Sequence, residues 1–366
     1  MISERINYEE FKIFREIPLL IKLRLKKLLD KKVKNKSKVL IIDTCIIGEF
    51  LATLPALSLF LKKNKLNTDI IVSPQVKSLA EAIKGIDRVF TAKSIYSRNI
   101  EQSDINQSIP KEYNTILVLR ISPEAYKLLN NIKYSNIITY DIPFFKYFSH
   151  LVKNLPLKKQ IKQWREVNFE IVGMKDYIKK IRFNDIFRFS KSDYEQIKKL
   201  SQMRRKSKKI IIHTGSVWKM RLWENKKWIS LLKKINKLGK FNFIFIGSTD
   251  IEKKSFEYIQ KNLDFKIFSL INKLDLKETL LLMRMSDYFI GIDSGPRNMA
   301  HLADLRSISL LSTGLNNFMP SNKKDIVINK SDAIFTSIFY YPKKNYMQEI
   351  TTEEVLEAFK KLSKTI

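Results

Sequence analysis

Residues 209–216 of the chain are KIIIHTGS. Three consecutive isoleucines predict a short buried strand, and the small polar residues after them predict a loop at its carboxyl end. The pattern continues with alternating segments, which predict strands over 241–246, 288–292 and 307–311, an extended piece over 265–270, and helices over 225–238, 251–262, 276–285, 298–304 and 351–364. Strands that alternate with helices are typical of a parallel α/β sheet.

A similar series begins at Lys38. It predicts strands over 39–42, 68–72, 89–90, 115–119 and 136–140, and helices over 50–63, 76–83 and 158–174. Two α/β series of about 150 residues each predict two Rossmann-like domains that face a cleft. The expected order is a basic amphipathic segment (1–36), a first domain (37–182), a linker (183–208), a second domain (209–345) and a C-terminal helix (346–366).

The composition supports two globular cores. The chain has 366 residues, of which 44% are hydrophobic and 11% aromatic, so disorder of the bulk of the chain is excluded. The single cysteine, Cys45, rules out an internal disulfide and agrees with a reducing compartment. No signal-peptide pattern and no apolar run of about 20 residues is found, which predicts a cytoplasmic location.

The formal net charge of +31 leaves several interpretations open. An excess of lysine along the whole chain reflects either a coding bias or an anionic partner, such as nucleic acid, an anionic membrane surface or a phosphorylated glycolipid. No nucleic-acid-binding motif is present, which argues against nucleic acid. Residues 1–36 mix apolar and basic side chains, so they form either a membrane-interface helix or a packing helix with a solvated linker.

The first domain contains one candidate catalytic carboxylate. Gly48 and Glu49 follow the strand at 39–42 and precede a helix. A carboxylate near a helix N-terminus is stabilised in its ionised form and can remove a proton from an attacking hydroxyl. Complementing the helix dipole is the alternative role of Glu49, and Asp43, at the strand end, is the rival base. Cys45 is expected to pack beside the sheet.

The second domain contains two loops suited to phosphate groups. The first loop has Thr214, Gly215 and Ser216 after the strand, with Lys219 and Arg221 just beyond. Hydroxyls, backbone N–H groups and two cations can cradle a diphosphate, although the same residues can form an ordinary solvated loop. The second loop is the sequence DSGP at 293–296, where Asp293 either binds sugar hydroxyls or caps the next helix.

Other site types are not supported by the sequence. No GxGxxG motif follows the first strand of either domain, which argues against a nicotinamide or flavin cofactor, and no cofactor is expected. No motif with the residue types and spacing of a metal site stands out in the sequence. His301 lies in an apolar helical stretch, where a satisfied helix residue is the expected role.

The motifs, in this order, resemble glycosyltransferase family 9, the family of the lipopolysaccharide heptosyltransferases. The resemblance covers residues 38–362 and rests on Gly48-Glu49 with Leu54-Pro55-Ala56-Leu57, Gly215-Ser216 with Arg221-Leu222-Trp223, Gly247 with Glu252, Asp293-Ser294-Gly295-Pro296, and the tail at 347–355. It implies a GT-B fold and an inverting, metal-independent glycosyltransferase. It also implies a nucleotide-sugar donor, with ADP-heptose the choice by analogy, and a lipopolysaccharide or other envelope glycan as acceptor. The terminal helix is then expected to cross back to the first domain.

The resemblance also implies roles for individual residues. Glu49 takes the place of the family's catalytic Asp, and Arg221 that of the Lys that neutralises the leaving diphosphate. Asn298 stands where the family usually has His. The remaining donor-site residues are Thr214, Gly215, Ser216, Lys219, Ser294 and Gly295 near the phosphates, Glu252 at the ribose, Leu274 at the base and Asp293 at the transferred sugar. The departures at Glu49 and Asn298 keep an alternative open, a catalytically idle GT-B protein that binds nucleotide-sugar or glycan as a scaffold.

Overall fold

The structure is a computed structural model. It describes residues 38–64, 66–92, 109–119, 128–129, 132–138, 152–153, 181–200, 207–216, 218–312, 324–330 and 345–364. The chain forms two compact units, which divide between Arg188 and Phe189, inside the segment predicted as a linker. Helices α6 (Phe183–Ile186) and α7 (Lys191–Leu200) lie on the two sides of this division. The basic segment 1–36 and the helix predicted over 158–174 lie outside the described residues.

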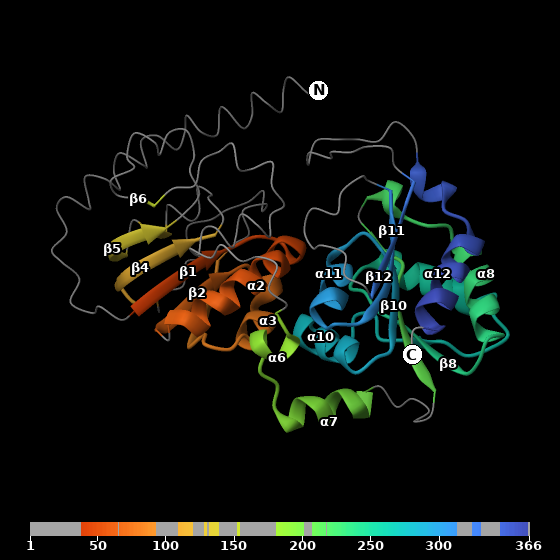
Figure 1. Cartoon of the computed structure of the whole chain (residues 1–366), viewed down its shortest axis with the longest axis horizontal. Coiled ribbons are helices and arrows are strands. Elements are labelled where there is room, and N and C mark those ends of the chain that lie inside the picture. Colours follow the sequence, from red (N-terminus) through yellow and green to blue (C-terminus); the bar gives the residue numbers. More distant parts are fainter. Residues whose placement is uncertain are drawn as a thin grey trace, which may run out of the picture. The chain divides into compact units, whose positions relative to one another are not determined.

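The first unit contains a six-stranded parallel sheet in the order β3-β2-β1-β4-β5-β6 (Figure 1). Its strands are β1 (Lys38–Asp43), β2 (Asn67–Val72), β3 (Arg88–Thr91), β4 (Glu112–Val118), β5 (Lys133–Ile138) and β6 (Val152–Lys153). Helix α2 (Ile47–Asn64) connects β1 to β2, and η1 (Pro74–Val76) with α3 (Lys77–Glu81) connects β2 to β3. Because β1 pairs with both β2 and β4, the order of connections reverses at the carboxyl end of β1.

The second unit repeats this topology in the order β12-β11-β10-β7-β8-β9. Its strands are β7 (Lys208–His213), β8 (Phe241–Phe245), β9 (Phe268–Ser269), β10 (Tyr288–Ile292), β11 (Arg306–Leu311) and β12 (Asp325–Asn329). Its helices beyond α7 are η5 (Lys219–Arg221), α8 (Asn225–Asn236), α9 (Asp250–Lys261), α10 (Leu276–Arg284), α11 (Gly295–Leu302), η6 (Tyr346–Glu349) and α12 (Thr352–Lys364). The two parallel-sheet units confirm the predicted pair of Rossmann-like domains.

Alternating strand residues of the second unit face two helical layers. Ile210 and Ile212 of β7 join a core with side chains of α8, α9 and α12, whereas the intervening Ile211 points to the opposite face. Figure 1 shows α10 and α11 along the face of this sheet opposite to α8 and α12. The three-isoleucine strand is buried on both faces, as the sequence predicts for a parallel sheet.

The terminal helix α12 packs on the sheet of the second unit. Val355, Phe359 and Leu362 of α12 pack into the core of the second unit, and α12 contacts α8, β11 and β12. An aromatic contact between Phe359 and Tyr288 of β10, with ring centroids 5.2 Å apart, belongs to the same packing. The apolar stripe of this helix is therefore buried within the second unit.

Candidate functional site

The two phosphate-type loops lie at the topological switch point of the second sheet. Strand β7 pairs with β8 on one side and β10 on the other, so the loops after β7 and β10 leave adjacent strands at the same edge. The two loops meet through His213, whose Nδ1 lies 3.1 Å from the Oγ of Ser294. Ser294 Oγ also donates a hydrogen bond of 3.0 Å to the carbonyl oxygen of Ile292.

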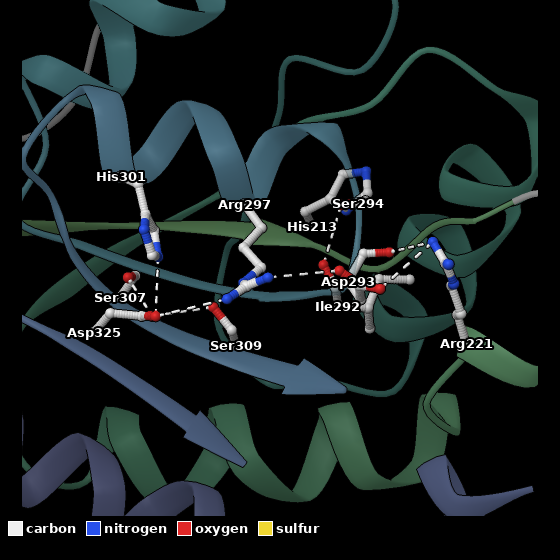
Figure 2. A network of polar contacts seen from close by, with 10 residues as sticks. All are labelled: His213, Arg221, Ile292, Asp293, Ser294, Arg297, His301, Ser307, Ser309 and Asp325. Carbon is white, nitrogen blue, oxygen red and sulfur yellow. Dashed lines mark hydrogen bonds and ion pairs between the residues drawn. The ribbon is translucent and has the colours of Figure 1, made fainter. Parts of the chain in front are cut away.

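Arg221 and Asp293 connect the loops a second time. The Nη1 atom of Arg221 donates to the carbonyl oxygen of Asp293 at 3.2 Å and lies 3.6 Å from its carboxylate Oδ2. Figure 2 shows this contact at one end of a longer network that continues through Arg297 to Asp325. The structure thus brings together the predicted leaving-group cation and the predicted sugar-binding carboxylate.

Glu252 lies directly beneath the loop after β7. An added Cβ at Gly215 would lie 2.3 Å from Glu252 Cγ, and one at Gly247 would lie 2.5 Å from the same atom, so both glycines are required for its close approach. Glu252 accepts a hydrogen bond of 2.8 Å from the Thr249 backbone N–H, and its Oε1 lies 3.3 Å from His213 Nε2. Burial raises the pKa of Glu252, but the hydrogen bonds from His213 and Thr249 outweigh burial and lower it overall.

A pocket of about 570 Å³ adjoins the first loop within the second unit. It is lined by the predicted donor residues Thr214 and Lys219 and by residues of the loop 222–225, helix α9 and Gln348. The Thr214 hydroxyl is buried and has no hydrogen-bond partner among the residues that the structure describes.

The remaining predicted donor residues are distributed around these loops. Lys219 is exposed in η5, and Ser216 accepts a hydrogen bond of 3.1 Å from the Trp218 N–H. Gly295 begins α11, and Asn298 is buried within it. Leu274 is half-buried between β9 and α10.

The structure excludes the alternative role considered for Asp293, that of helix cap. Ser294 occupies the N-cap position of α11, and Pro296 lies in the first turn of that helix. Asp293 therefore does not cap the helix, and its carboxylate faces Arg221 and Arg297 instead.

The candidate base lies at the switch point of the first unit. Glu49 is in the first turn of α2, as predicted, and is buried. The rival Asp43 is fully buried at the end of β1, where it accepts hydrogen bonds from Cys45 Sγ at 2.6 Å and Thr53 Oγ1 at 3.0 Å. The expected packed position of Cys45 is confirmed, and these hydrogen bonds give Asp43 a structural role.

Four polar residues of the site were not among the predicted site residues: His213, Arg297, His301 and Asp325. His213 follows a predicted strand directly, which is a usable signal, but its partners Ser294 and Glu252 depend on the order of the strands. His301 lies within α11, as predicted, and its Nε2 lies 2.9 Å from Asp325 Oδ2, but this nitrogen has no hydrogen-bond partner among the described residues. No local pattern marks Asp325, which begins β12.

Neither a metal-ion cluster nor a membrane-spanning helix occurs among the residues that the structure describes. In that part of the chain no three or more His, Cys, Asp or Glu side chains are grouped so that they could hold a metal ion. None of the helices described is long and apolar enough to cross a membrane.

Two Rossmann-like units with polar loops at their switch points are the architecture of the GT-B fold. The chain belongs to glycosyltransferase family 9, the heptosyltransferase family, whose model matches residues 143–349. It is accordingly a glycosyltransferase of the heptosyltransferase-like type.

Solved structures share this fold across most of the chain. The family 9 glycosyl transferase of Veillonella parvula DSM 2008 is 15% identical, with a TM-score of 0.72 over 91% of this chain and 99% of that one. ADP-heptose LPS heptosyltransferase II of E. coli is 14% identical, with a TM-score of 0.67 over 89% and 98% of the two chains. E. coli heptosyltransferase WaaC with ADP-2-deoxy-2-fluoro heptose is 13% identical, with a TM-score of 0.66 over 88% and 99%. Comparison with curated proteins gave no match.

Proposed function

We propose that the chain transfers a sugar from a nucleotide-sugar to a lipopolysaccharide or other envelope glycan, with inversion and without a metal ion. Heptose from ADP-heptose is the proposed donor by analogy with the family, since a fold does not determine the sugar. The observation that carries the proposal is the contact of Arg221 with Asp293 where the two loops of the second unit meet.

The donor diphosphate is assigned to these loops. Arg221 supplies a fixed cation, and Lys219 a second one at the edge of the adjoining pocket. The hydroxyls of Thr214 and Ser216 and the start of α11 at Ser294 and Gly295 add hydrogen-bond donors. Such fixed charges and dipoles stabilise a departing diphosphate where no metal ion does so. Glu252 is proposed to contact the ribose, Leu274 the base, Asn298 the donor and Asp293 the hydroxyls of the sugar.

Glu49 is proposed as the general base. It removes the proton from the acceptor hydroxyl while that oxygen attacks the anomeric carbon and the bond from this carbon to the diphosphate oxygen breaks. The position of Glu49 in the first turn of α2 supports this role, because the helix N-terminus favours an ionised carboxylate.

A transfer assay tests the proposal. The chain is incubated with labelled ADP-heptose or other nucleotide-sugars and with envelope glycolipid acceptors, and the anomeric configuration of the product is read by NMR. Turnover in the presence of EDTA and an inverted product are the expected results. Donor binding without transfer to any acceptor would instead identify a nucleotide-sugar-binding scaffold.

The basic segment 1–36 is proposed to attach the chain to anionic lipid at the cytoplasmic membrane surface, where a glycolipid acceptor would be found. Binding to anionic liposomes should weaken as salt rises and disappear when residues 1–36 are removed. Equal binding by the full and the shortened chain would contradict the attachment.

A further inference from the structure

Behind the Asp293 loop lies a buried charged cluster that the proposed reaction does not use. Arg297 and His301 are four residues apart on α11 and point from the same face of the helix toward Asp325. The Nη2 atom of Arg297 lies 3.8 Å from Asp325 Oδ2, and His301 Nε2 lies 2.9 Å from the same oxygen. Figure 2 shows the contacts that lead from His301 to Asp325 and from there through Arg297 to Asp293.

Asp325 is the anchor of this cluster. Its side chain is 0% exposed, and its other oxygen, Oδ1, accepts hydrogen bonds from Ser307 at 2.7 Å and Ser309 at 3.1 Å. These two serines lie on one face of β11, two residues apart. A buried carboxylate is costly unless it is paired and hydrogen-bonded. The two serines supply hydrogen bonds to Oδ1, and Arg297 and His301 face Oδ2.

Arg297 extends from this anchor toward the site. Its side chain is 2% exposed, and its second nitrogen, Nη1, lies 3.7 Å from Oδ1 of Asp293. The two ends of one guanidinium therefore face two carboxylates, a buried one and one at the edge of the donor loops. Asp293 is 17% exposed and has Arg221 on its other oxygen, so guanidinium groups face both of its oxygens.

We propose that Arg297 is a positioning residue, whose guanidinium fork ties Asp293 to the buried Asp325 and so fixes the carboxylate that selects the sugar part of the donor. The inference rests on the proposed function, in which Asp293 contacts the transferred sugar. It assigns a role in specificity to three residues, Arg297, Asp325 and His301, that need not touch the donor.

The fork matters more than the charge in this arrangement. A lysine carries the same charge on a single nitrogen, so it cannot place one nitrogen toward Asp293 and a second toward Asp325 as the planar guanidinium does. Arg297→Lys should therefore keep much of the buried charge balance while losing the orientation of Asp293. Arg297→Gln removes both the positive charge and the orientation of Asp293.

The test compares two ligands on the full chain, ADP-heptose and ADP, by calorimetric titration. Arg297→Gln and Arg297→Lys should weaken ADP-heptose binding about tenfold and ADP binding by less than about twofold, because a displaced polar group affects the contacts that it orients. If Arg297 had only a structural role, its replacement would weaken the binding of ADP-heptose and of ADP by the same factor. Lys324→Gln is the control. It removes a cation from an exposed pair with Asp304 directly before β12, and it should leave the affinities for ADP-heptose and ADP unchanged.

Asp293→Asn separates this inference from the proposed function. If Asp293→Asn leaves the preference for ADP-heptose over ADP unchanged, the proposed sugar contact is wrong. If Asp293→Asn lowers that preference and Arg297→Lys does not, the sugar contact stands and the positioning role is overturned. The double variant Asp293→Asn/Arg297→Lys should lose no more preference than Asp293→Asn alone, since the two residues act in series. Thermal melting of each variant shows the temperatures at which it is folded, and the titrations are done there. If Arg297→Gln does not fold, Arg297→Lys still tests the inference.

Discussion

Arg221 and Asp293 lie on different connections of the second sheet, yet Arg221 Nη1 donates to the Asp293 carbonyl oxygen at 3.2 Å. The contact exists because β7 and β10 are neighbours, which brings the loops after these strands to the same edge. A cation held in this way is oriented before any ligand arrives, and this lowers the entropic cost of binding an anion.

Replacing Arg221 with alanine should weaken both the nucleotide-sugar and its nucleoside diphosphate. A charge-assisted hydrogen bond contributes about 1.5–3 kcal/mol, which corresponds to a loss in affinity of about 10- to 150-fold. Calorimetric titration of both ligands measures the loss. Lys219→Ala is the comparison, with a smaller expected effect because Lys219 is exposed. Unchanged affinity in Arg221→Ala would assign the diphosphate contact to Lys219 instead.

Gly215→Ala should damage the donor site without removing any polar group. The new Cβ would lie 2.3 Å from Glu252 Cδ, and it can fit only if this buried carboxylate leaves His213 and Thr249. Overpacking of this kind costs about 1–3 kcal/mol of folding free energy, and donor affinity should fall with it. Urea unfolding and donor titration measure the two effects. Gly239→Ala is the matched control, since its Cβ would meet only the Phe241 ring at 3.6 Å.

The stability of the first unit should depend on Asp69 in a pH-dependent way. Burial, the largest influence, raises the pKa of Asp69, but hydrogen bonds from Arg88 and Tyr113 and the charges of Arg88 and Lys38 outweigh it, so the pKa is lowered. A lowered pKa in the folded state stabilises the protein above the unfolded pKa of about 3.9, and this contribution is lost as the pH falls through the folded pKa.

Asp69→Asn should therefore cost about 2 kcal/mol at pH 7, and the difference from the unchanged chain should narrow below about pH 4. Thermal melting followed by circular dichroism across that range measures it. Glu112→Gln removes a half-exposed carboxylate of the same unit, 3.8 Å from Lys133, and should change stability by less than about 0.5 kcal/mol. A difference for Asp69→Asn that stays constant with pH would contradict the prediction.

The sequence predicts the elements of this fold better than it predicts the contacts of the site. The β-branched runs 39–42 and 210–212 identify the central strands, and a strand end followed by a helix identifies the loops at Glu49, Thr214 and Asp293. His213 and Ser294 are 81 positions apart, and their contact depends on β10 lying beside β7. Asp325 has no local signal, because its partners come from α11 and β11. Strand order is a property of the packed sheet, which local patterns do not encode.

Replacing Glu49 with glutamine is the sharpest test of the chemistry. Glutamine keeps the shape of the side chain but cannot accept a proton, so turnover should fall by about 10²–10⁴-fold while donor affinity stays nearly unchanged. Single-turnover transfer with the true donor and acceptor measures the first effect, and titration with the donor measures the second. Glu49→Asp should keep activity or raise it, since it restores the family's shorter carboxylate. Glu81→Gln is the control: it removes an exposed carboxylate paired with Lys77 on α3 and should leave turnover unchanged. Undiminished turnover in Glu49→Gln would exclude Glu49 as the base, and Asp43 could then be the base only by giving up its hydrogen bonds from Cys45 and Thr53.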